Sequence, residues 1–126
     1  GHTDNDLSIY DEKTKTILTE NIFVHRTPSI TASTIGWTKT LEEMLEMEFE
    51  YIIPGHGELK SKEDAIKPML SYFNNLITQV RKFHSEGKDL DYAIKNTLVK
   101  NKYNWLLYEE YHPRNVSRTF TELEWE

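Results

Sequence analysis

The sequence predicts a mixed α/β (α+β) domain in which a small sheet comes first and helices follow. Short β-branched runs separated by polar turns occupy residues 1–60, a pattern typical of strands and hairpins. Apolar residues at helical spacing dominate residues 61–126, which indicates helices packed on a core. The length of 126 residues is that of one domain. We therefore expect a single domain with its strands, turns and one helix in residues 1–60.

A β-hairpin is expected near the start of the chain. Residues 6–10 alternate apolar and polar side chains, and residues 11–15 supply a polar turn. Residues 16–24 then return as a β-branched run. Two such runs joined by a short polar turn are typical of a hairpin.

One helix and one further strand complete the first half. Pro28 interrupts the chain, and Ser33 or Thr34 is placed to cap a helix that continues to about residue 49. Residues 51–53 (Tyr-Ile-Ile) follow as a short buried strand, which a Pro-Gly pair ends.

Three helices are expected beyond residue 60. Ser61, three residues before an aspartate, resembles a capping box at the start of a long helix that Gly87 ends. Asp89 is expected to cap a shorter helix, and Asn115 a last one. Residues 105–111 are strongly aromatic and fit either a helix or a loop. We assign the apolar stripes of these helices to packing and no chemistry.

The composition excludes several classes of partner. A net charge of −6 opposes nonspecific binding to nucleic acids or anionic membranes, because such binding depends on clustered Lys and Arg. The absence of cysteine excludes disulfides and thiolate metal ligands. No apolar run reaches the roughly 18 residues of a membrane span, and no secretory leader opens the chain. We expect a cytoplasmic protein that binds neither nucleic acid nor membrane.

Three candidate metal ligands fall at expected strand ends. His2 precedes the first strand, Glu20 lies at the far end of the hairpin, and His56 follows the third strand in a glycine-flanked turn. Imidazole nitrogens and carboxylate oxygens bind zinc, and a catalytic site keeps one position open for water. Mixed sheets can gather such ends onto one edge. The alternative is that His2 is an exposed terminal residue and His56 a turn histidine.

Three motifs resemble, in the same order, the second half of a metallo-β-lactamase superfamily domain. They are residues 1–6 (Gly-His-Thr-Asp-Asn-Asp), 18–23 (Leu-Thr-Glu-Asn-Ile-Phe) and 52–57 (Ile-Ile-Pro-Gly-His-Gly). The resemblance implies a single partial domain, 1–126, that forms the C-terminal half of an αββα sandwich. It covers residues 1–60 well and residues 61–126 only loosely.

The resemblance also implies roles for the three candidate ligands. His2 corresponds to a ligand of the first metal, His56 to a ligand of the second, and Glu20 to the bridging carboxylate. The family has an aspartate at this bridging position, one methylene shorter than glutamate. Its histidine-x-histidine-x-aspartate-histidine cluster has no counterpart in the chain. Without that cluster, the catalytic residues stay unassigned.

The function expected from these motifs is that of the C-terminal portion of a zinc-dependent hydrolase, inactive alone. Zinc lowers the pKa of bound water to about 7 and polarises a scissile carbonyl or phosphoryl oxygen. The complete protein would act on a small-molecule substrate, and His25, in the loop after the hairpin, is assigned to substrate contact. An exposed loop position is the alternative for His25.

A rival function is that of a non-catalytic structural or oligomerising domain derived from the same fold. The chain begins at Gly rather than Met, so we expect it to be processed, tagged or cut from a longer protein. An isolated half would expose an apolar sheet face and edge. We therefore expect self-association, or pairing with the missing N-terminal half.

Overall fold

A four-stranded sheet opens the chain in the computed structural model, which describes residues 8–19, 27–28, 30, 33–54, 60–99 and 105–126. The hairpin pairs β1 (Ser8–Asp11) and β2 (Thr16–Thr19) in antiparallel fashion, and β3 (Tyr51–Ile53) lies parallel to β2. A two-residue β4 (Lys60–Ser61), which the sequence pattern did not predict, adds antiparallel to β3. The sheet order is β1-β2-β3-β4.

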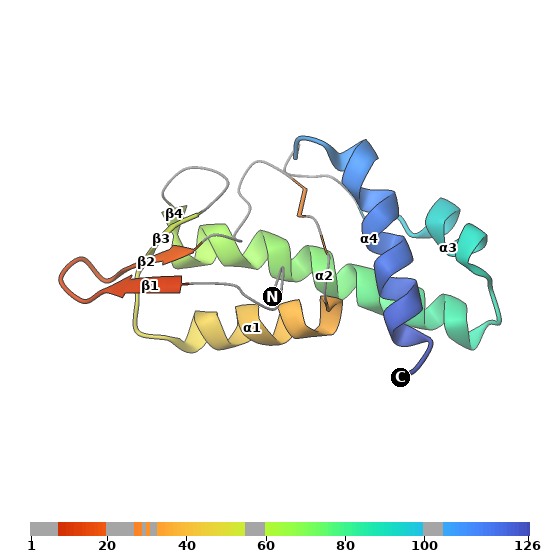
Figure 1. Ribbon diagram of the computed structural model, residues 1–126, viewed down its shortest axis with the longest axis horizontal. Coiled ribbons are helices and arrows are strands. Elements are labelled where there is room, and N and C mark those ends of the chain that lie inside the picture. Colours follow the sequence, from red (N-terminus) through yellow and green to blue (C-terminus); the bar gives the residue numbers. More distant parts are fainter. Residues whose placement is uncertain (1–7, 20–26, 29, 31–32, 55–59, 100–104) are drawn as a thin grey trace.

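Helices make up most of the remaining described chain. They are α1 (Thr34–Glu46), α2 (Lys62–Ser85), α3 (Leu90–Asn96) and α4 (Tyr108–Leu123). Figure 1 shows α1 running antiparallel to the long α2, with the sheet beside the start of α2 and α4 crossing its far half. The mixed α+β class and the order of a hairpin followed by a helical region are confirmed. Within the described ranges, no helix combines the length and apolar character needed to cross a membrane.

The sheet has one buried and one partly exposed face. Ile17 and Ile52 are direct cross-strand partners and are buried. Their neighbours Leu18 and Ile53 are also partners but are 41% and 43% exposed, because side chains alternate between the two faces of a strand. The short strand expected at residues 51–53 is present, but the expectation that it is buried is wrong for Tyr51 and Ile53, since only the middle residue is enclosed.

The expected helix starts match the structure at three places. The Ser33 hydroxyl accepts from the backbone N–H of Gly36 at 2.8 Å, which makes it the N-cap of α1. Ser61 and Asp89 cap α2 and α3 in the same way, each accepting a backbone N–H three residues ahead. Gly87 follows the C-cap of α2 with a φ of +70°, a conformation that glycine adopts without strain.

The last helix starts earlier than the sequence pattern predicts. α4 begins after Leu107, whose φ is +61°, and it includes the second half of the ambiguous 105–111 segment. Asn115 therefore lies inside the helix and is buried, so its expected role as an N-cap is wrong. The physical reason is that its side-chain amide bonds residues far away in the sequence rather than the backbone N–H groups of the next turn.

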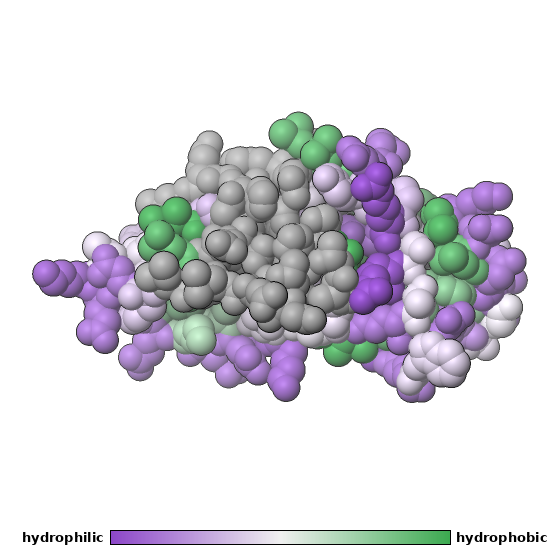
Figure 2. All heavy atoms as spheres, in the orientation of Figure 1, coloured by the Kyte–Doolittle hydropathy of each residue, from purple (hydrophilic) through white to green (hydrophobic). Residues whose placement is uncertain are grey.

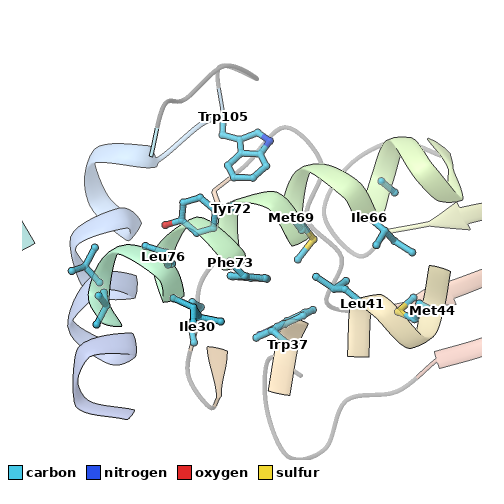
Figure 3. Close-up of a cluster of buried hydrophobic side chains, with 14 of the residues drawn as sticks. Ile30, Trp37, Leu41, Met44, Ile66, Met69, Tyr72, Phe73, Leu76 and Trp105 are labelled. Atoms are coloured by element: carbon cyan, nitrogen blue, oxygen red, sulfur yellow. The ribbon is translucent and has the colours of Figure 1, made fainter. Parts of the chain in front are cut away.

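The core lies mainly between α2 and the elements around it (Figure 3). Trp37 of α1 stacks on Phe73 of α2 with 5.6 Å between ring centroids, and Tyr72 meets Trp105 edge-on at 5.4 Å. Ile30 reaches the same cluster from the segment before α1. Ile30 is therefore fixed to the helical layer through its side chain.

Candidate functional site

Three strand ends meet at one edge of the sheet. Ser8, the first residue of β1, pairs with Thr19, the last residue of β2. Leu18 pairs with Ile53, the last residue of β3. Because β2 and β3 are parallel, both end at this edge, and the antiparallel β1 begins there (Figure 1).

The residues predicted as a metal and substrate site lie outside the described ranges. Glu20 follows Thr19 directly, and His56 comes two positions after Pro54. His2 precedes β1, and His25 comes two positions before Thr27. The structure thus describes the strand ends nearest in sequence to His2, Glu20 and His56, whereas Thr27, the described residue nearest to His25, belongs to no strand.

The two histidines within the described ranges, His84 and His112, make hydrogen bonds inside the helical layer. The Nε2 atom of His84 lies 2.9 Å from the carbonyl oxygen of Phe120, and its ring stacks on the Phe120 ring. His112 is buried and bonds a tyrosine and a backbone carbonyl. Within the part of the chain that the structure describes, no three His, Asp or Glu side chains form a group that could hold a metal ion.

A buried polar cluster, which we call the polar latch, is formed by Tyr72, His112 and Asn115. The Tyr72 hydroxyl lies 2.9 Å from Nδ1 of His112, while the Asn115 amide donates to that hydroxyl at 3.0 Å. The Nε2 atom of His112 lies 2.8 Å from the carbonyl of Thr97, just after α3. In Figure 3 the Tyr72 hydroxyl points from α2 toward α4. The polar latch therefore joins α2 and α4 through side chains and attaches them to the backbone at the end of α3.

The hydrogen bonds of the polar latch determine which of its nitrogen and oxygen atoms donate and which accept. The Thr97 carbonyl can only accept, so Nε2 of His112 carries a hydrogen and donates to it. The Nδ1 atom of neutral His112 then accepts from the Tyr72 hydroxyl. Burial lowers the pKa of His112, against smaller opposite effects of the Thr97 carbonyl and Glu109. Burial also raises the pKa of the Tyr72 hydroxyl. Both shifts favour the neutral forms.

The sequence holds a signal for the polar latch that the apolar stripe of α4 alone does not reveal. His112, Asn115 and Thr119 recur at helical spacing together with Val116 and Leu123, and all five side chains are buried. Polar side chains on the buried face of a helix require partners there. Figure 2 shows hydrophilic side chains on the opposite, exposed side of α4.

A cavity of about 540 Å³ lies at the other end of the sheet. It is lined by the hairpin and by the loop before β3, including Tyr10, Lys15, Met47 and Phe49. The Tyr10 hydroxyl donates to the backbone carbonyl of Glu48 at 2.9 Å across this region. Since Thr16 and Tyr51 pair where β2 and β3 begin, the cavity is separated from the three strand ends by the length of the strands. It is not part of the predicted metal site.

Neither a scan against models of known protein families nor a search of curated proteins finds a match for this chain.

Proposed function

We propose that this chain is the C-terminal portion of a metallo-β-lactamase-like, zinc-dependent hydrolase, and that it is inactive alone. The observation that supports this most is the pairing of Ser8 with Thr19 and of Leu18 with Ile53. Leu18 and Thr19 belong to the motif that carries Glu20, Ile53 belongs to the motif that carries His56, and Ser8 follows the motif that carries His2. A shared sheet edge is where side chains from separate segments can converge on one ligand.

The proposed ligands suit zinc. Two imidazoles and one carboxylate are typical zinc donors, and three protein ligands leave a position open for water. When bound, zinc would lower the pKa of that water and polarise the substrate. Because the ligands that would complete two metal sites have no counterpart in this chain, His2, Glu20 and His56 would share one ion, with His25 in contact with a small-molecule substrate. The chain lacks the family's histidine-rich cluster, which supplies the remaining ligands and a base, so the site needs a further segment for turnover.

The outer face of the sheet supports the proposal of a protein partner. Leu18, Tyr51 and Ile53 are each more than 40% exposed on adjacent strands, and Figure 2 shows apolar side chains beside the strands. Exposed apolar groups gathered on one face favour association. The occupant we propose is the missing half of the domain, or a second copy of the chain in its absence. If zinc does not bind, this surface favours the alternative of a non-catalytic oligomerising domain.

Metal analysis of the purified chain tests the zinc proposal. The protein is prepared with an acetylated N-terminus, because a free α-amino group beside His2 would add a metal ligand of its own. We expect one equivalent of zinc by calorimetry and elemental analysis, with its loss in His2→Ala and His56→Ala. His84→Gln is the matched control, because His84 bonds a backbone carbonyl through Nε2, stacks on Phe120 and lies far along α2.

The outcomes separate the two functions. Stoichiometric zinc that depends on His2 and His56 supports a surviving metal site, whereas no zinc in the unaltered chain would leave the non-catalytic alternative. The second readout is hydrolysis of generic esters and phosphodiesters with zinc added. We expect no turnover. Turnover abolished by His56→Ala would contradict the claim that the chain is inactive alone.

A further inference from the structure

The cavity at the turn end of the β1–β2 hairpin, which we call the hairpin cavity, is lined by apolar side chains. Ile17 of β2 and Phe49 of the loop before β3 line it and are buried. Tyr10 and Met47 also line it and are 43% and 51% exposed. Its volume of about 540 Å³ suits a small organic molecule, since sites for such ligands span roughly 300–1,000 Å³. A ligand that covers these side chains would therefore bind through apolar contact.

Hydrogen bonds hold the two walls of the hairpin cavity together. Figure 1 shows the hairpin turn and the loop from α1 to β3 at the same end of the sheet. The carbonyl of Lys15, the last residue of the turn, accepts from the N–H groups of Glu50 and Tyr51 at 2.8 and 3.2 Å. The Tyr10 hydroxyl donates to the carbonyl of Glu48 at 2.9 Å. The turn and the loop are therefore joined through their backbones, and the cavity is formed before a ligand arrives.

The charged side chains that line the hairpin cavity carry an excess of negative charge. They are Glu12, Lys15 and Glu48, which supply two carboxylates and one ammonium group. None of the three forms an ion pair with another residue in the part of the chain that the structure describes. Lys62 lies outside this lining, because its Nζ atom donates to the Met47 carbonyl at 2.9 Å. Unpaired carboxylates at the mouth of an apolar cavity attract a positively charged ligand.

We propose that the hairpin cavity binds a small organic cation, an ammonium group attached to an aromatic body. The body would cover the apolar lining, where the flexible side chain of Met47 can adapt to its shape. The ammonium group would be held by the carboxylates of Glu12 and Glu48 and by the exposed ring of Tyr10, whose face attracts cations. An anion would meet two like charges there. This site uses none of the proposed zinc ligands and is independent of the proposed function.

Three probes of similar shape and different charge test the inference. They are 1-naphthylmethylammonium, the neutral 1-naphthylmethanol and the anion 1-naphthylacetate, each titrated into the isotope-labelled chain without added zinc and followed by amide NMR. We expect the cation to shift the amide signals of Ile17 and Phe49, with a dissociation constant on the order of 1 mM for a ligand of this size. The alcohol should bind about fivefold more weakly, because it lacks the charge that the carboxylates attract, and the anion more weakly still.

Charge-removing variants identify the groups that hold the cation. Glu12→Gln combined with Glu48→Gln should weaken binding of the cation about fivefold and leave the alcohol unaffected. Both side chains are exposed, so the fold should tolerate the change. Glu42→Gln combined with Glu43→Gln is the matched control, because it removes the same charge from exposed positions of α1 outside the cavity. Lys15→Met removes the competing positive charge and should tighten binding of the cation about twofold.

Each other outcome overturns a stated part of the inference. If no probe shifts the signals of Ile17 and Phe49, the cavity is not a binding site. Equal affinities for the three probes, or equal effects of the two double variants, would overturn the preference for a cation. Tighter binding of the anion that Lys15→Met weakens would overturn it as well. If the same signals shift with protein concentration in the absence of a probe, a second copy of the chain occupies the cavity instead.

Discussion

The carboxylate of Glu122, near the end of α4, caps the start of α1 by accepting from the backbone N–H of Thr34 at 2.7 Å. The same carboxylate accepts from the Ser33 hydroxyl at 2.6 Å. The first N–H groups of a helix have no partner within it and carry partial positive charge, so a carboxylate is favourable there. Behind it, the hydroxyls of Thr34 and Thr119 lie 2.7 Å apart and are buried. The two helices are thus joined by polar contacts between residues more than 80 positions apart.

Glu122→Ala is expected to destabilise the fold by about 1–3 kcal/mol, because it removes charge-assisted hydrogen bonds from a helix start. Glu122→Gln should cost less, since the amide keeps one acceptor. Urea denaturation monitored by circular dichroism measures both. Glu124→Ala is the matched control on the exposed side, with an expected effect within about 0.5 kcal/mol. A loss for Glu122→Ala no larger than that of the control would refute the capping role.

The stability of the fold should depend on pH through the protonation of His112. Because burial lowers the pKa of His112 below the ordinary value of 6.5, protons bind more readily to the unfolded chain as the pH falls. The stability is then fully present above about pH 6.5 and declines below it. His112→Gln, which cannot titrate, should flatten the decline between pH 7.5 and 5.5. Denaturant midpoints across this range provide the measurement, and parallel curves for the two proteins would contradict it.

The parts of the fold that the sequence predicted are those governed by local rules. The caps Ser33, Ser61 and Asp89 each bond a backbone N–H three residues ahead. Gly87 ends α2 with the positive φ that its lack of a side chain permits. Such features depend on a few adjacent residues, so a short window of sequence contains them. The strand at residues 51–53 followed in the same way from a short apolar run that a Pro-Gly pair ends.

The parts that it missed depend on partners far along the chain. Asn115 is a good N-cap residue in isolation, yet residues 28, 30 and 72 satisfy its amide within a helix. From the sequence alone, Glu122 is indistinguishable from a solvated surface charge. In the fold its carboxylate accepts from the start of α1, because α1 lies beside α4. β4 has two residues, too few for any alternating pattern to appear. It forms because its backbone pairs with the neighbouring strand β3. The metal ligands His2, Glu20 and His56 stay a prediction.

Gly87→Ala is expected to destabilise the fold by about 1 kcal/mol, because a residue with a side chain is strained at a φ of +70°. Apart from its two neighbours in the chain, no heavy atom of the described residues lies within 4 Å of an added Cβ, so the cost comes from the backbone rather than from a clash. Gly87→Asn should recover part of the loss, since asparagine tolerates this conformation better. Thermal melts of the three proteins compare them, and a stabilised Gly87→Ala would show that the backbone relaxes.

Charge on the outer sheet face should reduce self-association of the chain. Leu18 and Ile53 are adjacent, half-exposed partners on β2 and β3. Covering an apolar surface of this kind with another surface lowers the free energy of the system, so it favours association. Leu18→Lys with Ile53→Lys should shift the mass seen by light scattering toward the monomer without a loss of helical signal. Leu98→Lys is the matched control, because Leu98 is 75% exposed near α3, away from the sheet. If the unaltered chain is monomeric at high concentration, or if Leu98→Lys has the same effect, the outer face is not the contact surface.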